Sequence, residues 1–147
     1  IEAEKSPTAK VSHHRLHEDF EGIDETIAMS SMYAANHLGA KVVATLTQTG
    51  KTALWMSRIS SNISIFAMSD NYKTLKKVTI YRGVYPCYIE KNSADDWNDV
   101  NSKVIESLLN KSVVVDKDIV ILTKGMHKDK SGGTNLMKIL RVGDGNY

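Results

Sequence analysis

The chain has 147 residues, 41% of them hydrophobic and 24% charged, which suits one compact domain able to bury a five-stranded core. Its 19 Lys and Arg against 17 Asp and Glu leave a formal net charge of +2, which argues against a nucleic-acid partner, since that would need basic residues gathered on one face. The sequence has no apolar run of about 20 residues, so we expect no contact with membranes. Its single cysteine, Cys87, excludes an internal disulfide, and we therefore expect a cytoplasmic protein.

The first residues differ in character from the rest. They are polar and show no clear period, so we interpret 1–20 as a lead-in segment and 21–147 as the folded domain. The chain starts at Ile1 without a methionine, which suggests a piece of a longer protein. His13 and His17 have i, i+4 spacing, but no cysteine or ordered carboxylate pattern completes a metal site, and we predict none.

A helix is predicted to follow this segment. Asp24 is the expected N-cap and Gly39 the expected end, with apolar and small residues between them at helical spacing. The small residues Ala28 and Ala35 permit another helix or a sheet to approach closely.

Apolar strands then alternate with helices. The strands are predicted over 42–46, 64–68, 84–89 and 118–123, and the helices over 51–59, 71–77 and 95–110. Asp70 is the candidate cap of the second of these helices, and 93–96 fits a capping box for the third. This alternation predicts right-handed βαβ units and a parallel sheet.

The end of the chain breaks the alternation. A last strand over 134–142 follows a loop of about ten residues without a helix, so it should run antiparallel at an edge. We therefore predict the α/β class: a three-layer α/β/α fold with a mostly parallel five-stranded sheet and an antiparallel last edge strand.

The turn after the first predicted strand carries the residue types that hold a phosphate. Its members are Thr47, Gln48, Thr49, Gly50, Lys51 and Thr52. Glycine lets the backbone approach a ligand, hydroxyls donate hydrogen bonds, lysine neutralises charge, and a helix N-terminus attracts anions. The alternative is an ordinary strand–helix turn in which Thr49 caps the helix. A P-loop for nucleoside triphosphates is disfavoured because the residue five positions before Gly50 is Thr45 instead of glycine.

A second loop with glycines and lysines, 125–134, follows the strand 118–123. Its candidate ligand-binding residues are Lys128, Ser131, Gly132, Gly133 and Thr134. Ligands of open parallel sheets bind beyond the carboxyl ends of the strands, where the strand order reverses. If 42–46 and 118–123 are neighbours there, the two loops share one crevice. The alternative is a solvated hairpin loop whose charge is incidental.

No set of nucleophile, base and orienting group indicates catalysis. Cys87 lies between Pro86 and Tyr88 in a predicted strand with no evident base, so we expect a packed thiol. Asp95 and Asp96 fit helix capping better than a pair of catalytic acids. We therefore predict no catalytic residue in this chain.

Several segments together resemble bacterial pyruvate kinases. They are VSHHRL at 11–16, DETIAMSSMYAANHL at 24–38, GKTAL at 50–54, SRISS at 57–61, YRGVYP at 81–86 and GTN at 133–135. The resemblance covers nearly the whole chain and about the last third of such an enzyme. It implies a carboxy-terminal domain with an allosteric effector site and a subunit interface. In that family the effector phosphate sits in the turn matching 47–52, and the loop matching 125–134 folds over the ligand.

The resemblance also implies what the chain lacks. The catalytic barrel, which uses phosphoenolpyruvate, ADP, Mg²⁺ and K⁺, has no counterpart here, so we expect 1–20 to lead in from that barrel and this piece to hold no cofactor. The parent enzyme would transfer phosphate from phosphoenolpyruvate to ADP and form a homotetramer, and the domain alone could form a dimer.

The resemblance favours a phosphorylated sugar or a nucleoside monophosphate as the effector, with the domain also contacting its own catalytic domain. The helix 24–38 and the strand 134–142 are the candidate interface elements. Two alternatives stay open: a purely structural tetramerisation domain without a working effector site, and an independent phosphotransferase.

Overall fold

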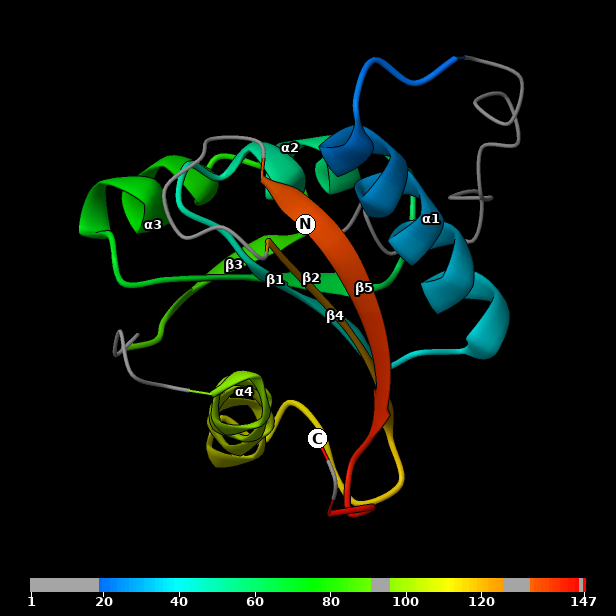
Figure 1. Cartoon of the computed structure of the whole chain (residues 1–147), viewed down its shortest axis with the longest axis vertical. Helices are drawn as coiled ribbons and strands as arrows, with labels where there is room; N and C mark the ends of the chain where they lie inside the picture. Colours follow the sequence, from blue (N-terminus) through cyan, green and yellow to red (C-terminus); the bar gives the residue numbers. More distant parts are fainter. Residues whose placement is uncertain (1–18, 91–95, 126–132, 146) are drawn as a thin grey trace.

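A computed structural model describes residues 19–90, 96–125, 133–145 and 147. Almost all of the predicted lead-in segment 1–20 lies outside them. The described residues form four helices and five strands (Figure 1). In chain order they are α1 (Ile23–Leu38), β1 (Val42–Leu46), α2 (Lys51–Ser57), β2 (Ser64–Ser69), α3 (Tyr72–Val78), β3 (Val84–Tyr88), α4 (Trp97–Asn110), β4 (Ile119–Gly125) and β5 (Thr134–Arg141). Every predicted helix and strand is present, with bounds that differ by at most two residues from those expected.

The strands form one sheet in the order β3-β2-β1-β4-β5. The first four strands are parallel, and β5 pairs with β4 antiparallel at the edge, so the predicted fold class is confirmed. Val43 pairs with Ile65 on one side and with Ile121 on the other, which makes β1 the central strand. The strand order reverses beside β1, because the chain first moves away through β2 and β3 and then returns to place β4 on the other side.

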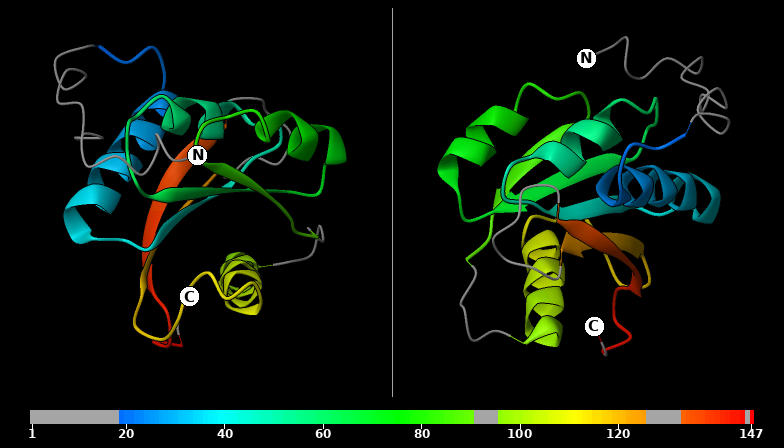
Figure 2. Two further views of the ribbon diagram at one scale, coloured as in Figure 1. Left: turned by 180° about the vertical axis from the view of Figure 1, so that it is seen from behind. Right: turned by 45° about the horizontal axis from the view of Figure 1, so that its top comes forward.

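Helices cover both faces of this sheet. α1, α2 and α3 lie over one face and α4 lies over the other, as Figures 1 and 2 show from three directions. β1 has five consecutive buried residues because it faces helices on both sides. The α4 face of the core gathers Leu46, Phe66 and Leu108, whereas the opposite face gathers Met32, Met56 and Ile121.

Two predicted helix caps are wrong. Gly22, which makes no side-chain cap, is the N-cap of α1, and Asp24 lies inside the first turn with its carboxylate buried. Asn71 caps α3 by accepting a hydrogen bond from the Lys73 backbone N–H at 3.0 Å, so Asp70 does not. The predicted end of α1 is confirmed: Gly39 adopts a left-handed conformation with φ of 65°. Residues 93–95 of the predicted capping box lie outside the described residues.

Two further observations bear on the class of protein. No helix in the described ranges combines the length and the apolar character that crossing a bilayer requires. Cys87 is buried and unpaired, with its sulfur 3.3 Å from the Ser107 hydroxyl, which confirms a packed thiol.

Candidate functional site

The turn after β1 has a defined conformation that Gly50 makes possible. Gly50 has φ of 78°, in the left-handed region that a side chain disfavours. Its backbone N–H donates to the buried Thr47 hydroxyl at 2.9 Å, and the Lys51 N–H reaches the Thr49 hydroxyl at 3.4 Å. The N-cap of α2 is Gly50 and not Thr49, whose hydroxyl makes only this long contact. The turn is therefore fixed mainly by Thr47 and Gly50.

Helix α3 supports the turn from one side. The Thr74 hydroxyl donates to the Gln48 carbonyl, and the Lys77 ammonium donates to the Thr49 carbonyl at 3.3 Å. A Cβ on Gly50 would lie 2.8 Å from Val78 Cγ1, so α3 also packs directly against the glycine. The sequence pattern did not identify Thr74 or Lys77, because their relation to the turn depends on the packing of α3 on β2 and β3.

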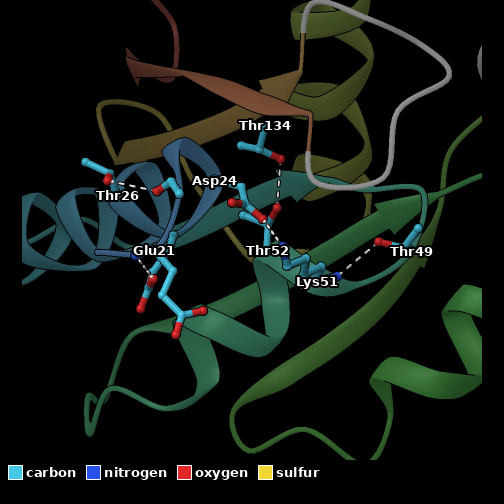
Figure 3. Close-up of polar contacts among 9 residues, drawn as sticks. Glu21, Asp24, Thr26, Thr49, Lys51, Thr52 and Thr134 are labelled. Carbon is cyan, nitrogen blue, oxygen red and sulfur yellow. Dashed lines mark hydrogen bonds and ion pairs between the residues drawn. The ribbon is translucent and has the colours of Figure 1, made fainter. Parts of the chain in front are cut away.

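The start of β5 supports the turn from the other side. The Thr52 and Thr134 hydroxyls lie 2.7 Å apart and are both buried, so the first turn of α2 is hydrogen-bonded to the strand that follows the second predicted loop (Figure 3). These two residues are separated by 82 positions in the sequence. The structure therefore brings together the 47–52 turn and Thr134, as the sequence predicts.

This hydroxyl pair gives a first testable expectation. We expect Thr52→Val to lower the free energy of unfolding by about 1–3 kcal/mol, because the buried Thr134 hydroxyl loses its partner. Thr134→Val should cost a similar amount for the same reason. The double variant should cost clearly less than the sum of the two, since it leaves neither hydroxyl unsatisfied. Urea denaturation of the three variants measures this, and strict additivity would contradict a direct hydrogen bond.

The lysine of the turn is held by a carboxylate of α1. Lys51 Nζ lies 2.9 Å from Asp24 Oδ2, and the Asp24 side chain is 7% exposed against 48% for Lys51 (Figure 3). That oxygen accepts no hydrogen bond of good geometry among the described residues, so the contact is an ion pair without an aligned hydrogen bond. Asp24 is thus another residue at this site that the sequence pattern did not assign to it.

The second predicted loop begins and ends beside this turn. The pairing of β4 with β5 is irregular between Lys124 and Gly125, and a Cβ on Gly125 would collide with the Gly133 backbone. The two ends of the loop are therefore in contact at the carboxyl end of β4. Because β1 and β4 are adjacent and parallel, this point and the 47–52 turn both lie at the carboxyl ends of the parallel strands. Of the other predicted residues, Lys128, Ser131 and Gly132 lie outside the described residues.

A buried lysine also lies at the carboxyl ends of these strands, on the face of the sheet that α4 covers. Lys124 is 4% exposed, and its ammonium donates to the Asn101 side-chain oxygen at 2.8 Å. Burial lowers the pKa of Lys124 from its ordinary value, the nearby charge of Lys138 lowers it further, and Asp96 opposes the shift. The strand predicted from the sequence ends at Thr123, so the sequence did not indicate that Lys124 belongs to β4 or is buried.

Two further threonines are buried in the strands that lead into the two candidate loops. Thr45 on β1 and Thr123 on β4 pair in register, and neither hydroxyl has a hydrogen-bond partner within the described part of the chain. The interior beside the switch in strand order is therefore unusually polar for the centre of a parallel sheet.

The residue types at this candidate site suit anion binding. Hydroxyls, a lysine and backbone groups of a glycine turn can hold a phosphate oxygen and balance its charge. Within the described ranges, no group of three or more His, Cys, Asp and Glu side chains could hold a metal ion. His13, His14 and His17 lie outside those ranges.

Comparison with known proteins gives one consistent family. The model of the family described as "Pyruvate kinase, alpha/beta domain" matches residues 25–140. A pyruvate kinase of Buchnera aphidicola subsp. Schizaphis graminum is 47% identical over 141 residues, which cover 95% of this chain and 29% of that protein. Pyruvate kinase II of Salmonella typhimurium is 45% identical over 141 residues, again 95% and 29%, and a Haemophilus influenzae pyruvate kinase is 45% identical over 125 residues, 84% and 26%. The chain spans less than a third of the length of these relatives.

Proposed function

Because the chain belongs to the pyruvate kinase family and corresponds to the C-terminal α/β domain of these enzymes, we propose that it binds a phosphorylated effector and contributes a subunit interface. One observation carries the effector role: β1 and β4 are parallel neighbours where the strand order reverses. That arrangement sets the 47–52 turn beside the ends of the 125–134 loop, and such a position is where open α/β sheets bind ligands.

The proposed effector is a phosphorylated sugar or a nucleoside monophosphate. Its phosphate would occupy the turn, with Lys51 as counter-ion and the threonine hydroxyls as donors, and residues 125–134 would close over the rest. The turn itself contributes one lysine, Lys51, and otherwise neutral donors, with Lys77 of α3 beside it, and we take this set to suit one phosphate group.

The wider role of the protein is part of the same proposal. The parent enzyme would transfer phosphate from phosphoenolpyruvate to ADP with Mg²⁺ and K⁺, in the cytoplasm, as a homotetramer. Effector binding would change how subunits pack and so tune the distant active site, an energetic coupling of typically about 1–3 kcal/mol. Exposed apolar side chains on α1 (Ile23, Tyr33 and Leu38) and on β5 (Ile139) support these elements as the interface.

Calorimetric titration of the purified chain tests the effector role. The ligands are fructose 1,6-bisphosphate, ribose 5-phosphate, glucose 6-phosphate and AMP, in buffer free of phosphate and sulfate. We expect saturable binding of a monophosphate, reduced at least about 100-fold by Thr49→Ala combined with Lys51→Ala, since two charge-assisted contacts are lost. Lys41→Ala is the matched control. Lys41 is exposed and directly precedes β1, at the end of the strand away from the 47–52 turn, so its loss should leave binding unchanged.

The alternative, a purely structural domain, predicts a different result. In that case no ligand binds, and sedimentation shows self-association that is the same with and without each phosphate compound. An independent phosphotransferase would instead hydrolyse ATP when Mg²⁺ is present.

A further inference from the structure

We propose that Asp24 is an internal counter-ion that competes with the effector's phosphate for Lys51, so that binding breaks the ion pair between α1 and α2. This inference rests on the proposed function and adds a means of regulation to the same site. Its basis is the ion pair between the first turn of α1 and the first residue of α2.

The position of Asp24 is that of a built-in anion. Its carboxylate lies in the first turn of a 16-residue helix, where the partial positive charge of the helix N-terminus stabilises it. Asp24 is buried, and a Cβ on Gly22 would lie 2.9 Å from its other oxygen, Oδ1, so the space around the carboxylate is confined. The only cation paired with it among the described residues is Lys51.

Lys51 is the partner that can exchange. Its side chain is about half exposed, so it can swing from α1 towards the 47–52 turn without disturbing the protein core. A phosphate monoester carries a charge of about −1.5 to −2 at neutral pH and offers three acceptor oxygens, whereas Asp24 offers one oxygen without an aligned hydrogen bond. The phosphate is therefore the stronger partner, and the ion pair lowers its apparent affinity.

The exchange has a consequence for α1. Once Lys51 pairs with phosphate, the buried Asp24 carboxylate loses its cation, and the first turn of α1 is destabilised. Ile23 begins this turn and is 68% exposed. A proposed interface helix thus responds to the occupancy of a site on its neighbour.

Calorimetry with inorganic phosphate and with ribose 5-phosphate as the probes tests the competition. We expect Asp24→Asn to tighten the binding of both by about 3- to 10-fold, because the competitor for Lys51 is removed. Glu25→Gln is the matched control: it removes a carboxylate from the adjacent position, whose partner is the Glu21 backbone N–H at 2.8 Å, and should change affinity less than about twofold. Equal tightening by both variants would show a general charge effect and overturn the proposal.

The same titrations in a Lys51→Met background complete the cycle. There Asp24→Asn should change affinity by less than about twofold, as for Glu25→Gln, and a persisting 3- to 10-fold effect would overturn the proposal. If the wild-type chain binds neither probe, the proposed function fails and this inference with it; if the wild type binds and Asp24→Asn does not tighten binding, only this inference fails.

Folding of each variant is checked by circular dichroism. Should Asp24→Asn not fold, NMR of the Lys51 ammonium in the wild-type chain replaces it. The chemical shifts of the Lys51 ammonium protons and of the Asp24 carboxyl carbon should both change when phosphate is added. A change at Lys51 without a change at Asp24 would overturn the proposed exchange of partners.

Discussion

Gly50→Ala is expected to lower the free energy of unfolding by about 2–5 kcal/mol and to abolish phosphate binding. A left-handed conformation costs a residue with a side chain about 1–2 kcal/mol, and Gly50 has φ of 78°. The added Cβ would also lie 2.8 Å from Val78 Cγ1, and forcing extra volume into a packed site costs about 1–3 kcal/mol more. Urea denaturation measures the stability, and calorimetry with ribose 5-phosphate measures the binding.

Two variants separate the backbone cost from the collision. Gly39→Ala is the control for the backbone, since Gly39 has φ of 65° and a Cβ added there would meet no atom within 4 Å, so it should cost only about 1–2 kcal/mol. Val78→Ala combined with Gly50→Ala should recover part of the loss by making room. Equal costs for Gly39→Ala and Gly50→Ala would show that the contact with α3 is unimportant.

Asn101→Leu is expected to lower the free energy of unfolding by about 1.5–3 kcal/mol. Asn101 accepts a hydrogen bond from the buried ammonium of Lys124, and its loss leaves a buried charge with one partner fewer. Lys124→Met should itself cost about 1–3 kcal/mol, because it leaves the buried Asn101 oxygen without its donor, and the double variant with Asn101→Leu should cost clearly less than the sum of the two. Asn98→Leu, at an exposed position on the same helix, is the matched control and should change stability by at most about 0.5 kcal/mol.

The same lysine predicts a pH dependence. Burial lowers the pKa of Lys124 in the folded chain, so between that lowered pKa and its ordinary value the unfolded chain binds more protons. The stability of the wild type relative to Lys124→Met should therefore rise with pH across this window and level off above it. Urea denaturation at several alkaline pH values measures the difference, and a difference that falls with pH would contradict a lowered pKa.

The sequence predicted the fold well because its signals are local. The apolar run at 42–46 fits a strand that is buried on both faces, and the sequence predicts no helix between 118–123 and 134–142, which favours an antiparallel edge strand. The two candidate loops were expected to share one crevice only if 42–46 and 118–123 are neighbours, and the pairing of β1 with β4 meets that condition. Thr134 was named for its place in the second loop, and its hydroxyl contacts that of Thr52.

The missed features depend on tertiary contacts. Asp24 looked like a helix cap, but α1 begins at Ile23, and Lys51 then offers the buried carboxylate a partner. Lys77 and Thr74 belong to a helix whose own sequence gives no reason to face the turn. Lys124 is charged and adjacent to a glycine, which are features of a loop, and its hydrogen bond to α4 helps to make its burial tolerable.

The place of β1 at the centre of the sheet has a consequence for hydrogen exchange. β1 has hydrogen-bonded neighbours on both sides, whereas β5 is paired, among the described strands, with β4 alone. Backbone amides of β1 should therefore exchange only through opening of the whole domain, and those of β5 through smaller openings of lower free energy. The 47–52 turn continues from the slowly exchanging strand and Thr134 belongs to the faster one, so ligand binding should slow exchange chiefly along β5.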